Sequence, residues 1–374
     1  MSSIDWFSLV VFVLALSAMV FLHEFGHFIA ARLFGIEVEE FGFGLPSYRI
    51  ATLFKWKGTE FTLHALPLGG FVRPKGENDP NVPGGLAAAS PWKRLAVLFA
   101  GPLMNLLTAV VVFGLITALQ GIPTLGPIHI DDVSANSPAQ QAGLQANDLI
   151  VAVNGQNVDR TSTVSSLIYA NLDKPVQLLI ERDGKQMTIT ATPLSSRQPN
   201  QGALGITMSP PTRAATIGEV LSDGFMITGL QAAGLVYLPI ALVQGAIQPS
   251  EARVVGLKGI FDIVNAAVQK DVQTRETEPT ASSGAPVSSG SRPTNWTLSV
   301  IAMLSVSLGV INLFPIPALD GGRILFTLPE ILFHRRVPPE VENMVNGVAM
   351  LLLIAFMIYI NAMDFINPAP PPIP

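Results

Sequence analysis

The chain has 374 residues, of which 49% are apolar and only 13% are charged, with a formal net charge of −5 and no cysteine. Soluble domains average about 25% charged residues, so this composition favours a membrane protein with several spans. The mild acidity indicates no nucleic-acid partner. Without cysteine, disulfides and thiolate ligands are excluded, and a metal site must use His, Asp or Glu.

The first element is an uncharged apolar run at residues 6–22, WFSLVVFVLALSAMVFL. Only Asp5 precedes it as a charge, the run is too long for the apolar part of a signal peptide, and no small-residue cleavage site follows it. We therefore expect a retained transmembrane helix, covering about residues 6–31.

The motif HEFGH, at residues 23–27, follows this run directly. On a helix His23 and His27 lie on one face and Glu24 is rotated to the side, a pattern typical of a zinc site whose glutamate acts on water. A rise of 1.5 Å per residue places His23 about 25 Å into a slab about 30 Å thick. The alternative is a chance pair of histidines, but charged groups in a span usually mark function. Catalytic zinc takes three protein ligands, so one is still missing.

The segment FGFGLPSYRIATLFKWKGTEFTLHALPLGGFV, residues 41–72, alternates and is rich in glycine and aromatic residues. It predicts β-hairpin strands that lie against the membrane face. A second span follows at about Leu95–Leu119, a third at about Trp296–Leu319 and a fourth at about Val345–Ile360.

Basic residues concentrate in two of the connecting loops, which predicts that both loops are cytoplasmic. The termini and residues 120–295 should then lie outside. The basic residues of the first loop are Arg32, Arg49, Lys55, Lys57, Arg73, Lys75, Lys93 and Arg94, and those of the second are Arg323, Arg335 and Arg336.

Residues 126–194 form a different unit of short strands and two small helices. GPIHIDDV and DLIVAVNGQ predict strands, SPAQQAGL and TSTVSSLIYANL predict helices, and VQLLIERDGKQMTITATP predicts a hairpin about an Asp-Gly turn. The stretch SPAQQAGLQANDLIVAVNG resembles the bacterial form of the PDZ domain. Such domains bind peptides by adding a strand to a sheet edge. The alternative is an αβ spacer without a ligand.

The motif NLFPIPALDGG, residues 312–322, closes the third span. Its two prolines break the helix inside the membrane, which requires that the freed backbone line a cavity or pack on protein. Asp320 is the carboxylate there, and we expect it to be the third metal ligand. Its alternative role is a helix-capping carboxylate. The competing ligands, in less suitable segments, are His64, His129 and His334.

The apolar stretch Phe225–Ile247 is ambiguous. HEFGH and LDGG can meet at one depth only if the first and third spans run in the same direction. The chain between the second and third spans must then cross the membrane an even number of times. We therefore expect this stretch to be an interfacial or membrane-dipping helix on the outside.

Together, HExxH in the first span, a PDZ insert and NxxPxPxLDGG resemble the site-2 protease family of intramembrane zinc metalloproteases. The likeness is greatest to its bacterial sigma-E protease branch, which acts in regulated intramembrane proteolysis. FGFG at 41–44, PLGGFVRPKGE at 67–77 and GPLMN at 101–105 match as well. Some members carry two PDZ domains, whereas this chain has one.

The resemblance implies one Zn²⁺ per chain and site residues in three groups. The groups are the metal ligands His23, His27 and Asp320; the catalytic base Glu24; and the substrate-binding residues Asn312, Pro315, Pro317, Gly69, Gly70 and Phe71. It also implies substrates that are single-span membrane proteins, such as an anti-sigma factor or a remnant signal peptide. A PDZ domain outside would bind peptide C-termini and admit substrates already trimmed by another protease.

The expected protein is thus a polytopic α-helical membrane protein with about four transmembrane helices, a membrane-associated β-hairpin region and an inserted αβ PDZ domain. It would sit in the lipid bilayer of a bacterial plasma membrane, with its active site toward the cytoplasm and its PDZ domain outside. One alternative is a catalytically inactive PDZ adaptor, which intact HExxH and LDG disfavour. Another is a transporter with a broken helix, which predicts inverted repeats that are not apparent.

These expectations divide the chain into ten segments. They are a first transmembrane helix (1–34), a β region (35–92), a second helix (93–121), the PDZ domain (122–196), an extracytoplasmic helical region (197–273), a disordered linker (274–295), a third transmembrane segment (296–322), a cytoplasmic loop (323–342), a fourth helix (343–367) and a Pro-rich tail (368–374).

Overall fold

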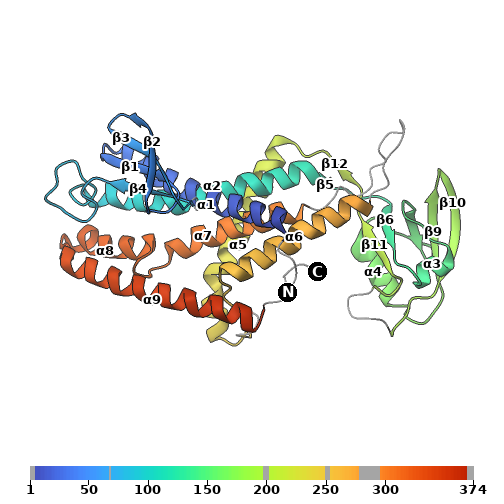
Figure 1. The fold of residues 1–374 in the computed structure, drawn as a ribbon. Helices are drawn as coiled ribbons and strands as arrows, with labels where there is room; N and C mark the ends of the chain where they lie inside the picture. Colours follow the sequence, from blue (N-terminus) through green and yellow to red (C-terminus); the bar gives the residue numbers. More distant parts are fainter. Residues whose placement is uncertain (1–4, 67–68, 197–201, 249–252, 278–294, 369–374) are drawn as a thin grey trace. The chain divides into compact units, whose positions relative to one another are not determined.

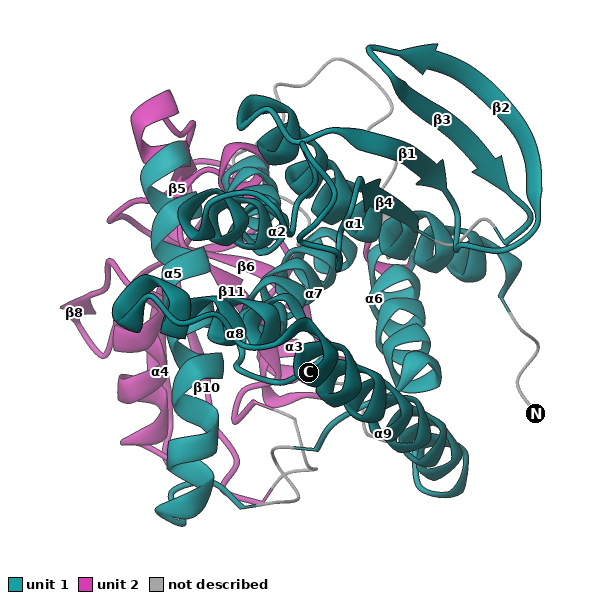
Figure 2. Ribbon diagram, turned by 90° about the vertical axis from the view of Figure 1, so that its left-hand side faces the viewer, with its two compact units in different colours: residues 1–115, 221–272, 295–373 teal, residues 116–220, 273–294, 374 magenta. Residues whose placement is uncertain are grey.

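The computed structural model describes residues 5–66, 69–196, 202–248, 253–277 and 295–368 (Figure 1). The chain divides into two compact units (Figure 2). Unit 1 comprises residues 1–115, 221–272 and 295–373, and unit 2 comprises 116–220, 273–294 and 374. Most of the predicted linker and the Pro-rich tail lie outside the described residues.

Five helices in the described part of the chain are long and apolar enough to cross a membrane. Four of them coincide with the predicted spans, and α5 covers the ambiguous stretch from Phe225 as far as Val243. They are α1 (Trp6–Leu33), α2 (Pro91–Gln120), α5 (Ile217–Val243), α7 (Trp296–Leu313) and α9 (Pro339–Ile366).

Helix α5 runs across α1, α2 and α7 rather than alongside them, as both views show (Figures 1 and 2). It approaches α2 closely at Gly224, where a Cβ would lie 2.4 Å from the carbonyl oxygen of Val110. Only glycine allows this approach. A crosswise helix is compatible with a position at the membrane surface, and that position stays a prediction.

The third predicted span is shorter than expected. Helix α7 ends at Leu313 and α8 (Asp320–Phe333) begins six residues after Phe314, so the continuous helix stops short of Leu319, at the break that the two prolines predict. The prolines at 315 and 317 disfavour helical backbone at the residues before them. Helix α8 also occupies much of the predicted cytoplasmic loop, which the sequence pattern did not reveal.

Helix α6 (Leu257–Thr277) is fixed at its start by a buried carboxylate. Asp364 of α9 is fully buried and accepts hydrogen bonds from the N–H groups of Gly256 and Gly259, at 2.7 and 3.0 Å. It also pairs with Arg253 at 3.1 Å. The helix continues to Thr277, so the expected linker boundary at 274 is too early.

A four-stranded sheet occupies the loop between α1 and α2, in the order β2-β3-β1-β4. The expected hairpin is present as β2 and β3, but β1 pairs with β3 in parallel, which alternation alone could not show. Strand β4 packs against α1. The strands are β1 (Val38–Phe43), β2 (Arg49–Trp56), β3 (Thr59–His64) and β4 (Gly70–Pro74).

Glu40 is a buried charge within this sheet, and only 3% of it is exposed. Its carboxylate accepts hydrogen bonds from Arg49 and Thr62, both at 2.7 Å, and lies 2.9 Å from Arg73. Burial raises the pKa of Glu40, but the hydrogen bonds from Thr62 and Arg49 outweigh it and leave that pKa below its ordinary value.

Unit 2 contains the predicted strands and helices of residues 126–194. Its main sheet has the order β10-β9-β7-β6-β11, with β8 beside β7, and α3 begins at an N-cap serine, Ser137, and ends at Gly143 in the left-handed conformation. The elements are β5 (Ile122–Pro123), β6 (Ile128–Val133), α3 (Pro138–Ala142), β7 (Leu149–Val153), β8 (Gln156–Asn157), α4 (Thr161–Tyr169), β9 (Val176–Arg182), β10 (Lys185–Ala191), β11 (Ile206–Ser209) and β12 (Thr212–Arg213).

The expected boundary of this unit at residue 196 stops too early. Strand β11 pairs with β6 at the sheet edge, and β12 pairs with β5. Both strands were assigned from sequence to a helical region. They are short, of four and two residues, so period-2 alternation gave no usable signal.

Candidate metal site

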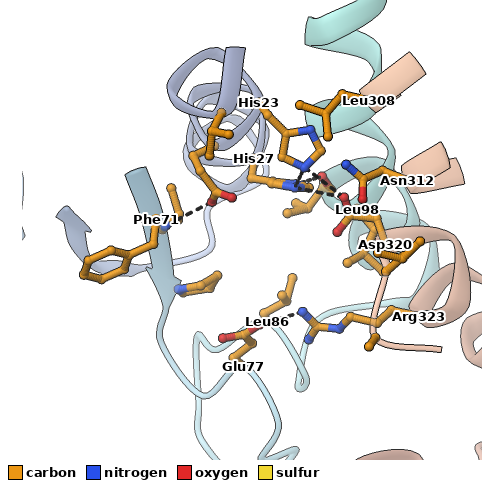
Figure 3. Close-up of a pocket in the computed structure, with 17 residues that line it drawn as sticks. His23, His27, Phe71, Glu77, Leu86, Leu98, Leu308, Asn312, Asp320 and Arg323 are labelled. Carbon is orange, nitrogen blue, oxygen red and sulfur yellow. Dashed lines mark hydrogen bonds and ion pairs between the residues drawn. The ribbon is translucent and has the colours of Figure 1, made fainter. Parts of the chain in front are cut away.

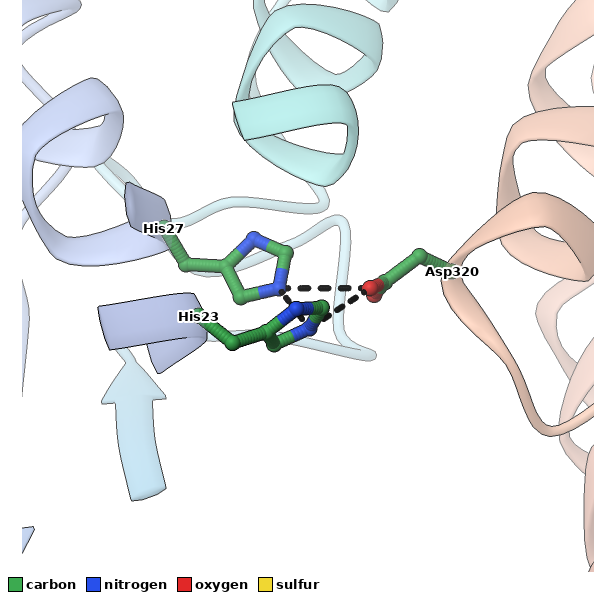
Figure 4. Close-up of side chains that lie close together, drawn as sticks. All are labelled: His23, His27 and Asp320. Carbon is green, nitrogen blue, oxygen red and sulfur yellow. Dashed lines mark hydrogen bonds and ion pairs between the residues drawn. The ribbon is translucent and has the colours of Figure 1, made fainter. Parts of the chain in front are cut away.

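Two histidines of α1 and one carboxylate of α8 converge on a common point (Figure 4). Nε2 of His23 lies 3.0 Å from Oδ2 of Asp320, and Nε2 of His27 lies 3.3 Å from the same oxygen. The two Nε2 atoms are 3.2 Å apart. Asp320 comes from 293 or more residues away in sequence, so the fold itself creates the cluster.

His27 is held by the helix that packs against it. Its Nδ1 lies 2.8 Å from the carbonyl oxygen of Val97 in α2, which accepts the Nδ1 proton and leaves Nε2 with a free lone pair. A Cβ at Gly101 would lie 2.3 Å from Nε2 of His27, and one at Gly26 would lie 2.3 Å from the carbonyl oxygen of Ala100. Both glycines therefore allow α1, α2 and the ring to fit together.

His23 has a side-chain partner on α2. Nδ2 of Asn105 lies 3.1 Å from Nδ1 of His23. Asn105 is fully buried, and His23 is 7% exposed. The outer nitrogens of both histidines are thus occupied by groups from α2, and their Nε2 atoms point to Asp320.

Asp320 is the first residue of α8, directly after the helix break. Gly321 permits this turn because a Cβ there would lie 2.2 Å from the carbonyl oxygen of Phe314. The N-cap of α8 is Leu319 and no side chain caps this helix start, so the Asp320 carboxylate does not act as the cap that the alternative expected; it faces both histidines. Its side chain is 14% exposed.

Glu24 points to the β sheet rather than to this cluster. Its Oε2 accepts a hydrogen bond of 3.0 Å from the N–H of Val72 in β4. Strand β4 is at the edge of the sheet, with β1 on one side only, and the N–H of Val72 donates to this carboxylate. Strand β4 and the carboxylate are thereby held next to each other.

The two histidines, Glu24 and Asp320 line a cavity of about 370 Å³ (Figure 3). Two of the predicted substrate-binding residues, Asn312 and Phe71, line it as well. The other four, Pro315, Pro317, Gly69 and Gly70, are described residues that do not line it. Pro315 and Pro317 lie in the helix break, and Gly69 and Gly70 at the start of β4.

The competing histidines lie elsewhere. His64 in β3 is bonded to Ser47 and Thr62, at 3.0 and 3.1 Å. His129 is in β6 of unit 2, and His334 follows α8 as its C-cap. Among the described residues, His23, His27 and Asp320 are the group of three whose donor atoms could hold one metal ion.

An ion pair crosses the wall of the cavity. Nη1 of Arg323, in α8, lies 2.6 Å from Oε1 of Glu77, in the segment after β4, and both residues line the cavity (Figure 3). None of Glu77, Arg323, Asn105 and Gly101 was predicted to be a site residue, although Arg323 marked a basic loop and the other three lie in the motifs PLGGFVRPKGE and GPLMN. The available signal was an asparagine inside an apolar span, since buried polar groups there need a partner.

Comparison of the sequence with known proteins identifies its family. A family model described as "Peptidase family M50" matches residues 11–356. Three similar proteins each carry the name "Putative zinc metalloprotease". One from Campylobacter jejuni is 33% identical and aligns over 94% of this chain and 91% of its own length. One from Clostridium acetobutylicum is 29% identical and aligns over 97% of this chain and 99% of its own length. One from Mesorhizobium japonicum is 31% identical and aligns over 94% of this chain and 96% of its own length.

Two solved structures resemble a smaller part of the chain. The PDZ domain of an SdrC-like protein from Listeria monocytogenes is 18% identical, with a TM-score of 0.20, and covers 22% of this chain and 86% of its own. A solution structure from Geobacillus thermodenitrificans is 30% identical, with a TM-score of 0.19, and covers 22% and 94%. The family match extends over nearly the whole sequence and confirms the resemblance of the motifs: the chain belongs to peptidase family M50, the site-2 protease family.

Proposed function

We propose that this chain is an intramembrane zinc metalloprotease that hydrolyses a peptide bond within a transmembrane segment of another membrane protein. The observation that carries the proposal is the convergence of His23, His27 and Asp320 in the cavity that Glu24 also lines. Two imidazoles and one carboxylate are a donor set that catalytic zinc uses, with a fourth position left for water.

The chain's own contacts fit a metal at this point. Both Nε2 atoms face inward because Val97 and Asn105 occupy the outer nitrogens, at 2.8 and 3.1 Å. In the metal-loaded protein, His23, His27 and Asp320 hold one Zn²⁺. The bound ion supplies Lewis acidity, which lowers the pKa of water to about 7 and polarises a carbonyl group.

Glu24 performs the proton transfers in this proposal. Its carboxylate lines the cavity beside the two histidines, so it takes a proton from the attacking water and delivers it to the leaving amine. The N–H of Val72 orients one carboxylate oxygen, Oε2, and leaves the other, Oε1, to act as the base.

In this proposal, strand β4 and the helix break bind the unwound substrate segment. A peptide bond inside a helix cannot react while its carbonyl is hydrogen-bonded, so a transmembrane substrate must unwind locally. Phe71 and Val72 of the edge strand line the cavity, and so does Asn312 at the end of α7. An unwound segment added to β4 recovers backbone hydrogen bonds there, and the amide of Asn312 offers a further polar contact.

The orientation proposed from the basic loops places the cavity toward the cytoplasm and unit 2 outside. Unit 2, whose SPAQQAGLQANDLIVAVNG segment resembles a PDZ domain, then restricts access to substrates with a suitable peptide end. A reporter fused after Pro249 tests this topology. Cytoplasmic readout at that point would contradict the matched depth of the two motifs.

The central experiment compares wild type with Glu24→Gln on a single-span model substrate in liposomes, with zinc content measured for both. We expect one zinc per chain in each protein and cleavage by wild type alone. The matched substitution Glu39→Gln, at an exposed carboxylate of β1, should leave cleavage intact. Wild type without zinc after metal-replete purification would refute the enzyme and favour a PDZ adaptor.

A further inference from the structure

Asn105 is a fully buried polar side chain in the middle of an apolar helix. Its amide lies 3.1 Å from Nδ1 of His23, and its Oδ1 has no hydrogen-bond partner among the residues that the structure describes. A buried amide without full pairing costs about 1–3 kcal/mol, so its position next to His23 calls for a physical reason.

The position of the proton on the His23 ring gives a physical reason for Asn105 to lie next to it. A neutral imidazole carries its proton on one ring nitrogen only. A metal at Nε2 needs the lone pair there, so the proton must be on Nδ1, and Nδ1 then needs an acceptor. Rotation of the Asn105 amide by 180° exchanges its oxygen and nitrogen, which places Oδ1 where it accepts that proton. Without a metal, the NH₂ end can instead donate to Nδ1, as the structure has it.

We propose that Asn105 is a positioning residue of the metal site, whose amide oxygen holds His23 in the tautomer that binds metal through Nε2. This rests on the proposed metalloprotease function. The two histidines then receive matched support from α2: a backbone carbonyl, that of Val97, for His27 and a side-chain carbonyl for His23. Outer partners of this kind are worth about 10- to 100-fold in metal affinity.

A purely structural role for Asn105 makes a different prediction. Its backbone carbonyl accepts a hydrogen bond of 2.9 Å from the hydroxyl of Ser305 in α7, so residue 105 also joins two helices. That contact uses no side-chain atom of Asn105 and survives any substitution at this position. Ser305→Ala removes it and leaves the amide in place, which makes it the matched control.

The test is zinc affinity of the full-length protein, measured by competition with a chromophoric chelator. Asn105→Leu keeps the volume and removes the acceptor, and we expect its affinity to fall about 10- to 100-fold. Asn105→Asp restores an acceptor oxygen and should recover wild-type affinity within a few-fold. Ser305→Ala should bind zinc as tightly as wild type. Should Asn105→Leu fail to fold, Asn105→Ala replaces it.

The outcomes separate the two proposals. If wild type binds no zinc, the proposed function fails. If wild type binds zinc and Asn105→Leu, with an unchanged thermal unfolding midpoint, binds it equally tightly, Asn105 does not position His23. A loss that Asn105→Asp does not reverse would also overturn the inference, because an acceptor at this point would then be irrelevant. Recovery by Asp with no effect of Ser305→Ala supports it.

Discussion

Gly101→Ala provides the most direct test of how α1 and α2 build the site. The added Cβ would lie 2.3 Å from Nε2 of His27, whereas ordinary van der Waals contact begins at 3.4 Å. The imidazole, or the whole helix, must therefore move by about 1 Å, the difference between these two distances. Zinc ligand distances are held within about 0.2 Å, so such a displacement removes His27 from any metal sphere.

We expect Gly101→Ala to lower the cleavage rate about 100-fold, the usual effect of a 1 Å misplacement, and to lower zinc affinity in parallel. Chelator competition measures the affinity, and cleavage of the single-span substrate in liposomes measures the rate. The control is Gly347→Ala in α9, since a Cβ there meets nothing within 4 Å. Glycine is a poor helix former, so this control should be neutral or slightly stabilising.

Wild-type zinc affinity and cleavage in Gly101→Ala would refute the reasoning. It would mean that α1 and α2 adjust without disturbing the histidines, and that the close approach is not a requirement of the site. A loss in both glycine variants would instead indicate general sensitivity of the membrane helices to added methyl groups.

Three further predictions concern other parts of the molecule. The pKa of Glu40 is below its ordinary value, so ionised Glu40 stabilises the fold above about pH 4.3, and this stabilisation is lost as pH falls through the lowered pKa. Hydrogen exchange in the β sheet should become faster over this pH range in wild type but not in Glu40→Gln. Asp148 is 1% exposed and pairs with Arg182 at 2.6 Å, so Asp148→Ala should destabilise unit 2 by about 3 kcal/mol, measured by hydrogen exchange of the full chain. Arg323→Ala breaks the partly exposed pair with Glu77, worth up to about 1 kcal/mol, and should speed zinc removal by a chelator up to about fivefold.

Each of these has a matched control. Glu39→Gln, at an exposed carboxylate of the same sheet, should retain the wild-type pH dependence. Asp132→Asn, exposed in β6, should leave unit 2 stable. Lys75→Ala breaks an ion pair with Glu37 near the cavity without touching its lining, so zinc release should be unchanged. Equal effects in a variant and its control would contradict the corresponding explanation.

The sequence was most informative where one physical constraint dominated. Apolar runs of about 20 residues predicted four of the five described helices that are long and apolar enough to span a membrane, because a span needs that length. Capping and turn residues located α3 and the β9–β10 hairpin of unit 2. Ser137-Pro138 is typical of a helix start, and Asp183-Gly184 is typical of a two-residue hairpin turn. The family resemblance followed from motifs whose chemistry is specific to a few residue types.

It was least informative where partners are distant in sequence. The parallel pairing of β1 with β3 and the edge strand β11 depend on contacts that no local pattern encodes. The partners of the two histidines illustrate the same limit. Val97 contributes only a backbone carbonyl, which any residue at that position would supply, and Gly101 matters only because a neighbouring helix brings a ring against it.

The helix break shows why the site needs this fold and not only its motifs. After Leu313 the chain leaves the helix, and the N–H of Ala318 is satisfied from outside the segment, by Oδ1 of Asn346 in α9 at 3.1 Å. Ala318 itself has a positive φ of 75°, a conformation that costs a non-glycine residue about 1 kcal/mol or more. The break is therefore held in place by α9 rather than relaxed. Because α8 begins only two residues later, its first side chain, Asp320, is fixed with its carboxylate at the two histidines, and a helix that ran on through Leu319 could not place it there.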